Sequence, residues 1–192
     1  MANFKSTITG PITVPMTRPM TRPMSGPLTV PMTTPMTVPP PDLVRTLHPG
    51  DVACAEKGEV LATLLGSCVA VILTDPRRTI GAMCHIVHSR TPLSHAKRDT
   101  SFGTVAMEAM DNLLMARGIN PQMCEAYVYG GGNMFPGLIT QSNVGDANAL
   151  WTLTMLRERG VRVVEKDLGG RVYRRIRWCV GFDAPTVSRV EV

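Results

Sequence analysis

The chain has 192 residues, with 20 Lys and Arg, 15 Asp and Glu, 5 Cys and 16 Pro. No run of about 18 apolar residues is present, which excludes a membrane-spanning helix, and the N-terminus lacks the apolar stretch of a secretory signal. Five cysteines without a C-x-x-C pair indicate neither a zinc ribbon nor a disulfide framework. We therefore expect a cytoplasmic protein with reduced thiols.

Residues 1–41 differ in composition from the rest of the chain. They hold ten of the 16 prolines, eight of which stand at every fourth position from Pro11 to Pro39, and a charge of +3. Because proline removes a backbone donor and fixes φ, we predict a disordered Pro/Met/Thr-rich tail that serves as a tether or a docking peptide. Residues 42–192 carry only +2, which argues against a nucleic-acid-binding domain.

The first half of this domain reads as a series of short strands. We expect strands at Leu43–Thr46, Gly50–Ala55, Glu59–Leu65, Val69–Leu73 and Ile80–Val87. Asp75-Pro76 is typical of a turn, so the last two strands form a hairpin in this interpretation. Residues 88–99 are polar and predict a loop.

The second half contains two helical patterns. A helix capped by Asp99 or Thr100 ends at Gly118, and its buried stripe is Val105, Ala106, Ala109, Met110, Leu113 and Leu114. A second helix from about Asp146 to Arg159 buries Leu150, Leu153 and Leu156. Strands are expected at Ala126–Tyr129, Val161–Glu165 and Val172–Val180. Helices and strands do not alternate one for one, which favours an α+β fold.

Cys68 is the first candidate for chemistry. It follows the break Gly66-Ser67 and precedes an apolar strand. Glycine lets the backbone bend, and the N–H groups of such a turn can stabilise an oxyanion. Most cysteines in this kind of setting are inert and buried, so the position alone does not decide between a nucleophile and a packing residue.

A nucleophilic cysteine needs a base, and His85 is the best placed histidine. It lies inside the apolar run 81–87, where an ionisable side chain is costly without a partner. In the predicted hairpin it lies beside the start of the Cys68 strand, and a Cys–His pair lowers the thiol pKa and supplies a general base. A satisfied core histidine is the alternative.

The remaining candidates favour structural roles. Cys84 and His85 point to opposite faces of a strand, so a metal site with His88 is not expected. His88 and His95 belong to the predicted loop. Cys54, Cys124 and Cys179 are interpreted as packing residues. The run Gly130–Asn133 has no phosphate-loop pattern and predicts a backbone turn beside the active site. A basic strand predicts a solvated face or a surface for an acidic partner, and it carries Arg171, Arg174, Arg175 and Arg177.

Several segments in one order carry a family resemblance. They are Leu64–Val71, Gly81–His85, Val105–Glu108, Gly130–Phe135, Asn143–Asn148 and Asp167–Gly170. Together they resemble the signature of the chemoreceptor glutamine deamidase family, CheD, over roughly residues 43–183. The tail has no counterpart in this resemblance, and Ile86–Ser89 departs from the more apolar continuation of many members.

The resemblance implies a fold, a reaction and a set of site residues. The fold is a three-layer α-β-β architecture similar to that of deamidating toxins. The reaction converts specific glutamines on chemoreceptor cytoplasmic helices to glutamate and ammonia, without a metal or organic cofactor. Cys68 matches the nucleophile and His85 the base, and the third residue falls at Ala62 or Thr63, of which Thr63 is the threonine. The backbone at Gly66 and Ser67 would hold the oxyanion.

The resemblance also implies partners and alternatives. The substrates are chemoreceptor cytoplasmic domains, and a CheC-type phosphatase is a further partner. No nucleic acid and no membrane insertion are expected. The competing hypotheses are a non-catalytic chemotaxis module that binds this phosphatase and a thiol hydrolase that acts on a different amide.

Overall fold

A computed structural model describes residues 44–90, 92, 98–134 and 143–191. All of them belong to one compact unit, Thr37–Val192. The predicted tail at 1–41 lies outside the described residues. No helix of the described part is long and apolar enough to cross a membrane.

The described chain begins with five strands and continues with helices between further strands. The strands are β1 (Val44–Leu47), β2 (Val52–Glu56), β3 (Val60–Leu65), β4 (Val69–Thr74), β5 (Ile80–Ile86), β6 (Glu125–Gly130), β7 (Arg162–Leu168), β8 (Val172–Cys179) and β9 (Thr186–Glu191). The helices are α1 (Gly103–Met115), the short 3-10 helix η3 (Pro121–Met123) and α2 (Val144–Glu158).

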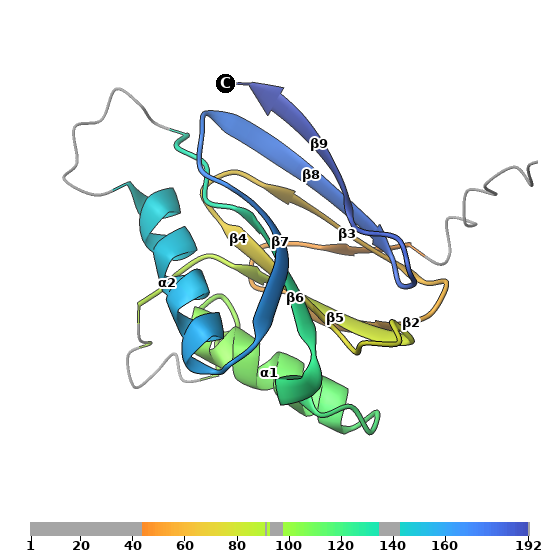
Figure 1. Ribbon diagram of the computed structural model, residues 1–192. Coiled ribbons are helices and arrows are strands. Elements are labelled where there is room, and N and C mark those ends of the chain that lie inside the picture. Colours follow the sequence, from red (N-terminus) through yellow and green to blue (C-terminus); the bar gives the residue numbers. More distant parts are fainter. Residues whose placement is uncertain (1–43, 91, 93–97, 135–142, 192) are drawn as a thin grey trace, which may run out of the picture. The chain divides into compact units, whose positions relative to one another are not determined.

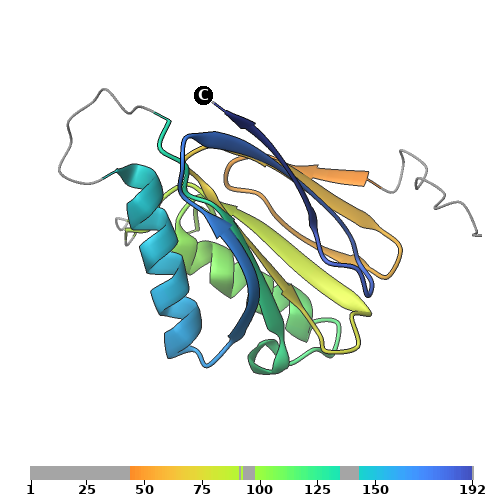
Figure 2. The same cartoon turned by 45° about the horizontal axis from the view of Figure 1, so that its top comes forward.

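The strands form two sheets. One has the order β1-β3-β8-β9 and the other β2-β5-β4-β6-β7. Both helices cover the outer face of the five-stranded sheet, and the four-stranded sheet covers its other face (Figure 1 and Figure 2). The expected α+β fold with α-β-β layers is therefore confirmed.

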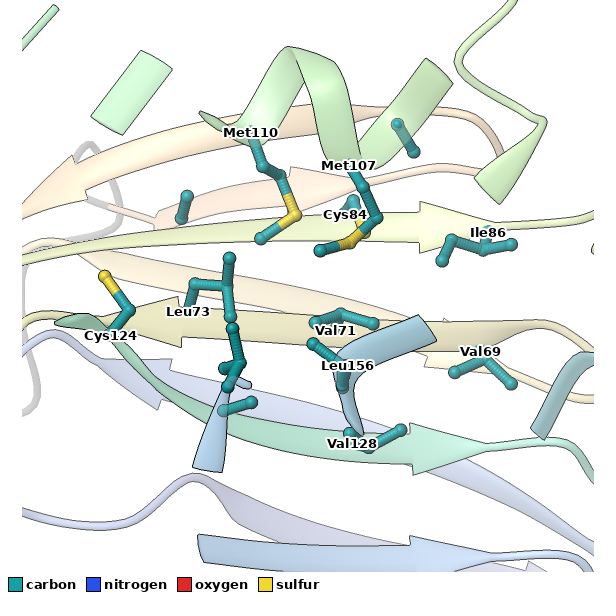
Figure 3. Packing of buried hydrophobic residues seen from close by; sticks show 14 of the residues in the cluster. Val69, Val71, Leu73, Cys84, Ile86, Met107, Met110, Cys124, Val128 and Leu156 are labelled. Atoms are coloured by element: carbon teal, nitrogen blue, oxygen red, sulfur yellow. The ribbon is translucent and has the colours of Figure 1, made fainter. Parts of the chain in front are cut away.

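The helix-side layer is apolar throughout its centre. Met107 and Met110 of α1 and Leu156 of α2 pack on Val71 and Cys84 of the sheet (Figure 3). Complete burial of each large side chain contributes roughly 1.5–3 kcal/mol to folding. We use the name helix-side layer for this cluster.

The second core lies between the two sheets, and we call it the inter-sheet layer. Leu61 of β3 and Ile176 and Trp178 of β8 face Ile72 and Met83 of the other sheet. This layer also receives the buried polar side chains of Thr63 and His85. Because side chains alternate along a strand, the odd-numbered residues of β5 face the inter-sheet layer and the even-numbered residues face the helices.

Four sequence predictions are wrong in detail. Helix α1 has Phe102 as its N-cap without a side-chain bond, because Asp99 accepts from Ser101 N instead. Leu150 is 69% exposed, since α2 turns a face with Asn148 and Thr152 inward. Strand β7 ends at Leu168, three residues beyond the predicted end at Glu165, and β9, whose side chains are mostly exposed, was not predicted.

Candidate active site

The Cys68 loop links the two sheets and is held by hydrogen bonds to its carbonyl groups. It comprises Gly66, Ser67 and Cys68, between the end of β3 and the start of β4. Their carbonyl oxygens accept, in order, from Gly132 N at 2.8 Å, Asn148 Nδ2 at 3.2 Å and Gly131 N at 2.8 Å. These bonds fix the loop through its oxygens, while its N–H groups take no part in them.

Glycines make this close approach of backbones possible. A Cβ on Gly130, whose φ is +114°, would lie 2.2 Å from the carbonyl oxygen of Cys68. A Cβ on Gly145, at the start of α2, would lie 2.4 Å from the carbonyl oxygens of both Gly131 and Gly132. The predicted backbone turn therefore does lie beside Cys68, and it is packed between this loop and α2.

Strand register places His85 near Cys68, as the predicted hairpin requires. In the antiparallel pair of β4 and β5, Val69 is opposite Ile86 and Ala70 is opposite His85. Cys68 is two residues before Ala70, so the side chains of Cys68 and His85 share the inter-sheet face. Cys84 lies in the helix-side layer, which agrees with the expected opposite orientation.

Thr63 contacts the His85 ring from the opposite sheet. Its hydroxyl donates to the Leu47 carbonyl at 2.8 Å and lies 2.9 Å from His85 Nδ1. Because the hydroxyl proton is used, Nδ1–H donates to Oγ1 and the lone pair resides on Nε2. Nε2 is buried and has no partner among the described residues. Of the two positions that the resemblance left open, Thr63 contacts the histidine, and Ala62 faces the other side of β3.

The ionisation of the pair differs from the sequence expectation. Burial lowers the pKa of His85 to about 4, although the Leu47 carbonyl and the Asp51 carboxylate favour the protonated ring. Burial also raises the pKa of the Cys68 thiol. The expected thiol with a lowered pKa is thus wrong for the resting site, which holds a neutral thiol and a neutral imidazole.

Asn148 is a polar residue of the site that the sequence analysis did not single out by itself. It is 1% exposed and uses both ends of its amide. Nδ2 donates to the carbonyls of Ser67 and Val87, at 3.2 and 3.0 Å, and Oδ1 accepts from Ser89 N at 3.0 Å. It therefore ties α2 to the Cys68 loop and to the chain that follows His85. A polar residue on the inward face of a helical pattern is the signal that could have found it.

A pocket of about 390 Å³ opens on the helix side of the same loop. It is lined by Ser67, Val87, His88, Ser89, Arg90, Val144, Ala147 and Asn148. Cys68 faces the inter-sheet layer, so this pocket adjoins the loop without containing the thiol. His88 also contacts the Phe102 ring at 5.0 Å, while His95 lies outside the described residues.

The other candidate residues divide between buried and exposed positions. Cys54 and Cys124 are buried as expected, but Cys179 is exposed on the outer face of β8, so its interpretation as a packing residue is wrong. Arg171 and Arg175 are exposed, whereas Arg174 is buried, which corrects the expectation of a fully solvated basic strand. In the part of the chain that is described, no three His, Cys, Asp or Glu side chains gather in a way that could hold a metal ion.

Comparison with known proteins gives one consistent family. A family model described as CheD chemotactic sensory transduction matches residues 88–182. The probable chemoreceptor glutamine deamidase CheD 2 of Albidiferax ferrireducens is 37% identical over 134 residues, which is 68% of this chain and 78% of that protein. Probable chemoreceptor glutamine deamidases CheD of Cereibacter sphaeroides and of a Caulobacter species are 37% and 36% identical.

The matched shares differ between these relatives. The chain spans 62% of the Cereibacter protein and 64% of the Caulobacter protein, which is under two thirds of their length. A solved structure, that of protein NMB0706 of Neisseria meningitidis, overlaps with a TM-score of 0.40 at 15% identity, over 68% of this chain and 65% of that chain. This structural likeness is too weak to assign a shared fold or function.

Proposed function

The chain belongs to the CheD family, and from this premise we propose that it hydrolyses the side-chain amides of specific chemoreceptor glutamines to glutamate and ammonia. The names of its relatives support the substrate and the reaction. The observation that carries the chemistry is His85 Nε2, which is buried, has no partner in the described part of the chain and lies on the face that Cys68 shares, while Nδ1 contacts Thr63. We assign the reaction to residues 42–192.

In the first half-reaction the proton and the nucleophile move together. Because the thiol and the imidazole are both neutral at rest, His85 Nε2 takes the Cys68 proton as the sulfur attacks the glutamine amide carbon. The carbonyl electron pair moves to oxygen, and in this proposal the backbone N–H groups at Gly66 and Ser67 donate to it. The imidazolium then gives its proton to the departing ammonia.

In the second half-reaction a water cleaves the thioester. His85 is neutral again and takes a proton from the water, whose oxygen attacks the acyl carbon. The sulfur leaves as the thiol after it receives this proton, and glutamate is released. Thr63 keeps the imidazole in one tautomer throughout, since its own proton is held by the Leu47 carbonyl. The two half-reactions need no metal and no organic cofactor.

The test is mass spectrometry of chemoreceptor cytoplasmic fragments incubated with the full chain. We expect a gain of about one mass unit at specific glutamines with the wild type and none with Cys68→Ala. Cys84→Ala is the matched control, because it removes a buried thiol from the other face of the same sheet. Conversion by Cys68→Ala at the wild-type rate would overturn the thiol mechanism, and no conversion by the wild type would overturn the reaction.

Two finer expectations accompany this function. A cytoplasmic location follows from a substrate on the cytoplasmic part of a receptor. A CheC-type phosphatase remains an expected partner, and titration of the full chain with such a phosphatase would detect binding. Binding to receptor fragments without any conversion would instead favour the non-catalytic module.

A further inference from the structure

Arg174 of β8 is a buried cation with unused hydrogen-bond donors. Its side chain is 3% exposed, and Nη2 donates to Asp167 Oδ1 at 2.9 Å and to the Gly169 carbonyl at 2.7 Å. Nε and Nη1 are buried and have no partner among the described residues. Each unmade hydrogen bond of a buried polar group costs about 1–3 kcal/mol, and more when the group is charged. Such donors point to an acceptor that arrives from outside the protein.

Register places Arg174 at the level of the Cys68 loop. On β3 and β8, Leu65 is opposite Arg174, and the Cys68 loop begins at the next residue, Gly66. Leu65 is buried in the inter-sheet layer, and the cross-strand partner shares its face. The guanidinium therefore enters the inter-sheet layer at the end of the sheets where Cys68 lies.

A row of side chains across the other sheet sets the position more closely. From β5 to β7 the paired residues are His85, Ala70, Tyr129 and Asp167. Thr63 contacts the first member of this row, and Arg174 contacts the last. Cys68 is two residues before Ala70 on the same face of β4. His85 is thus one strand away from β4, and Asp167, which holds Arg174, is two strands away on the other side.

The cation is also tied to the Cys68 loop by backbone hydrogen bonds. Gly169, whose carbonyl accepts from Arg174, donates its own N–H to the Gly130 carbonyl at 3.0 Å. Gly131, which follows Gly130 in the chain, donates its N–H to the Cys68 carbonyl at 2.8 Å. Burial alone would raise the pKa of Asp167, but the bonds from Arg174 and Arg189 outweigh it and hold the pKa low, so the carboxylate that anchors the guanidinium stays charged.

We propose that Arg174 is a further catalytic residue, whose N–H groups without a partner among the described residues donate to the oxygen of the glutamine amide while Cys68 attacks. This inference rests on the proposed function. When the sulfur–carbon bond forms, the carbonyl electron pair moves to oxygen, and a fixed cation in a water-poor layer stabilises the negative charge. The oxyanion therefore has a charged donor in addition to the backbone N–H groups of the Cys68 loop.

The kinetic test compares two arginines that share one carboxylate. Arg174→Met keeps the apolar stem and removes the donors, and we expect kcat to fall about 10²–10³-fold with little change in KM. Arg189→Met is the matched control, because Arg189 donates to the other oxygen of Asp167 and is 60% exposed. It should keep kcat within about threefold. Equal losses in both variants would assign Arg174 to the ion-pair network alone.

A second measurement does not depend on deamidation. We compare the rates at which anionic iodoacetate and neutral iodoacetamide alkylate Cys68, followed on the Cys68 peptide by mass spectrometry. A cation beside the thiol favours the anion, so Arg174→Met should lower the iodoacetate-to-iodoacetamide rate ratio about tenfold, and Arg189→Met should not. An unchanged ratio in Arg174→Met would overturn the inference.

The kinetic and alkylation measurements distinguish a failure of the proposed deamidation from a failure of the role proposed for Arg174. If the wild type converts no receptor glutamine but the alkylation ratio still depends on Arg174, the proposed function fails and the cation beside the thiol stands. If Arg174→Met does not fold, as judged by thermal unfolding, Arg174→Gln carries the same expectation, because it keeps a neutral donor toward Asp167 without the charge.

Discussion

The two core layers use the same strands for different purposes. On β5, Cys84 faces the helices and the next residue, His85, faces the other sheet. Burial raises the pKa of Cys84 to about 12, so that thiol is inert packing material. The inter-sheet layer instead holds Thr63, His85 and Arg174, each buried and each joined to a partner on the facing sheet or its connecting loops. Cys84 and His85 are almost equally buried, so their different contacts result from the face of the strand that each one occupies and not from burial itself.

Exchanging one residue on each face of β5 gives the largest expected difference. His85→Gln removes the base and should lower kcat for glutamine conversion by at least about 10³-fold. Cys84→Ala, one residue away in the helix-side layer, should leave kcat unchanged and cost roughly 1–2 kcal/mol of stability. Steady-state kinetics and denaturant unfolding measure both. Loss of activity in Cys84→Ala would remove the distinction between the layers.

The neutral state of His85 predicts a pH dependence of stability. Its pKa falls from 6.5 in the unfolded chain to about 4 in the folded protein, so the unfolded state binds the proton more readily. The contribution of neutral His85 to the free energy of unfolding should be fully present above pH 6.5. It should decrease by about 3 kcal/mol as the pH falls toward 4. The drop should be smaller by this amount in His85→Gln, and identical curves for the two proteins would contradict a neutral, buried ring.

The threonine on the facing sheet should have a moderate effect. Thr63→Val keeps the shape and removes the hydroxyl that accepts from His85 Nδ1, so the tautomer is no longer fixed. We expect kcat to fall about 10²-fold, by analogy with other groups that orient a catalytic histidine. Thr63→Ser retains the hydroxyl and should recover most of the rate. Equal rates for the valine and serine variants would rule out an orienting role.

The smallest expected effect concerns the tie between the layers and helix α2. Asn148→Ala removes three hydrogen bonds that hold the Cys68 loop and the chain after His85, and should lower stability by about 2–3 kcal/mol. Asn143→Ala, which removes only the N-cap bond to Gly145 N, should lower it by about 1 kcal/mol. Denaturant unfolding compares the two, and equal losses would show that Asn148 acts as an ordinary helix residue.

Local patterns were enough to predict the centre of the site. The Gly66-Ser67 break, the Asp75-Pro76 turn and the apolar strands together predicted that His85 lies beside the start of the Cys68 strand, and the register confirms it. These features are set by short-range chemistry, namely glycine flexibility, proline at a turn and strand alternation. The resemblance added Thr63, which is 22 residues from His85 in sequence.

Long-range polar partners could not be predicted in the same way. Asn148 bonds to residues 59 to 81 positions away, and a single side chain leaves no periodic trace of such bonds. Arg174 sits in a run of arginines that reads as solvated, and only the alternation of β8 separates it from Arg175. Leu150 was expected in the core for the converse reason, because the polar pair Asn148 and Thr152 occupies the inward face of α2.

The packing of Gly145 against Gly131 and Gly132 has a mechanical consequence. No side chain separates these backbones, and even a methyl group would overlap the two carbonyl oxygens. Helix α2 and the turn that supports Cys68 are therefore in direct main-chain contact, and any side chain at position 145 would push the two apart.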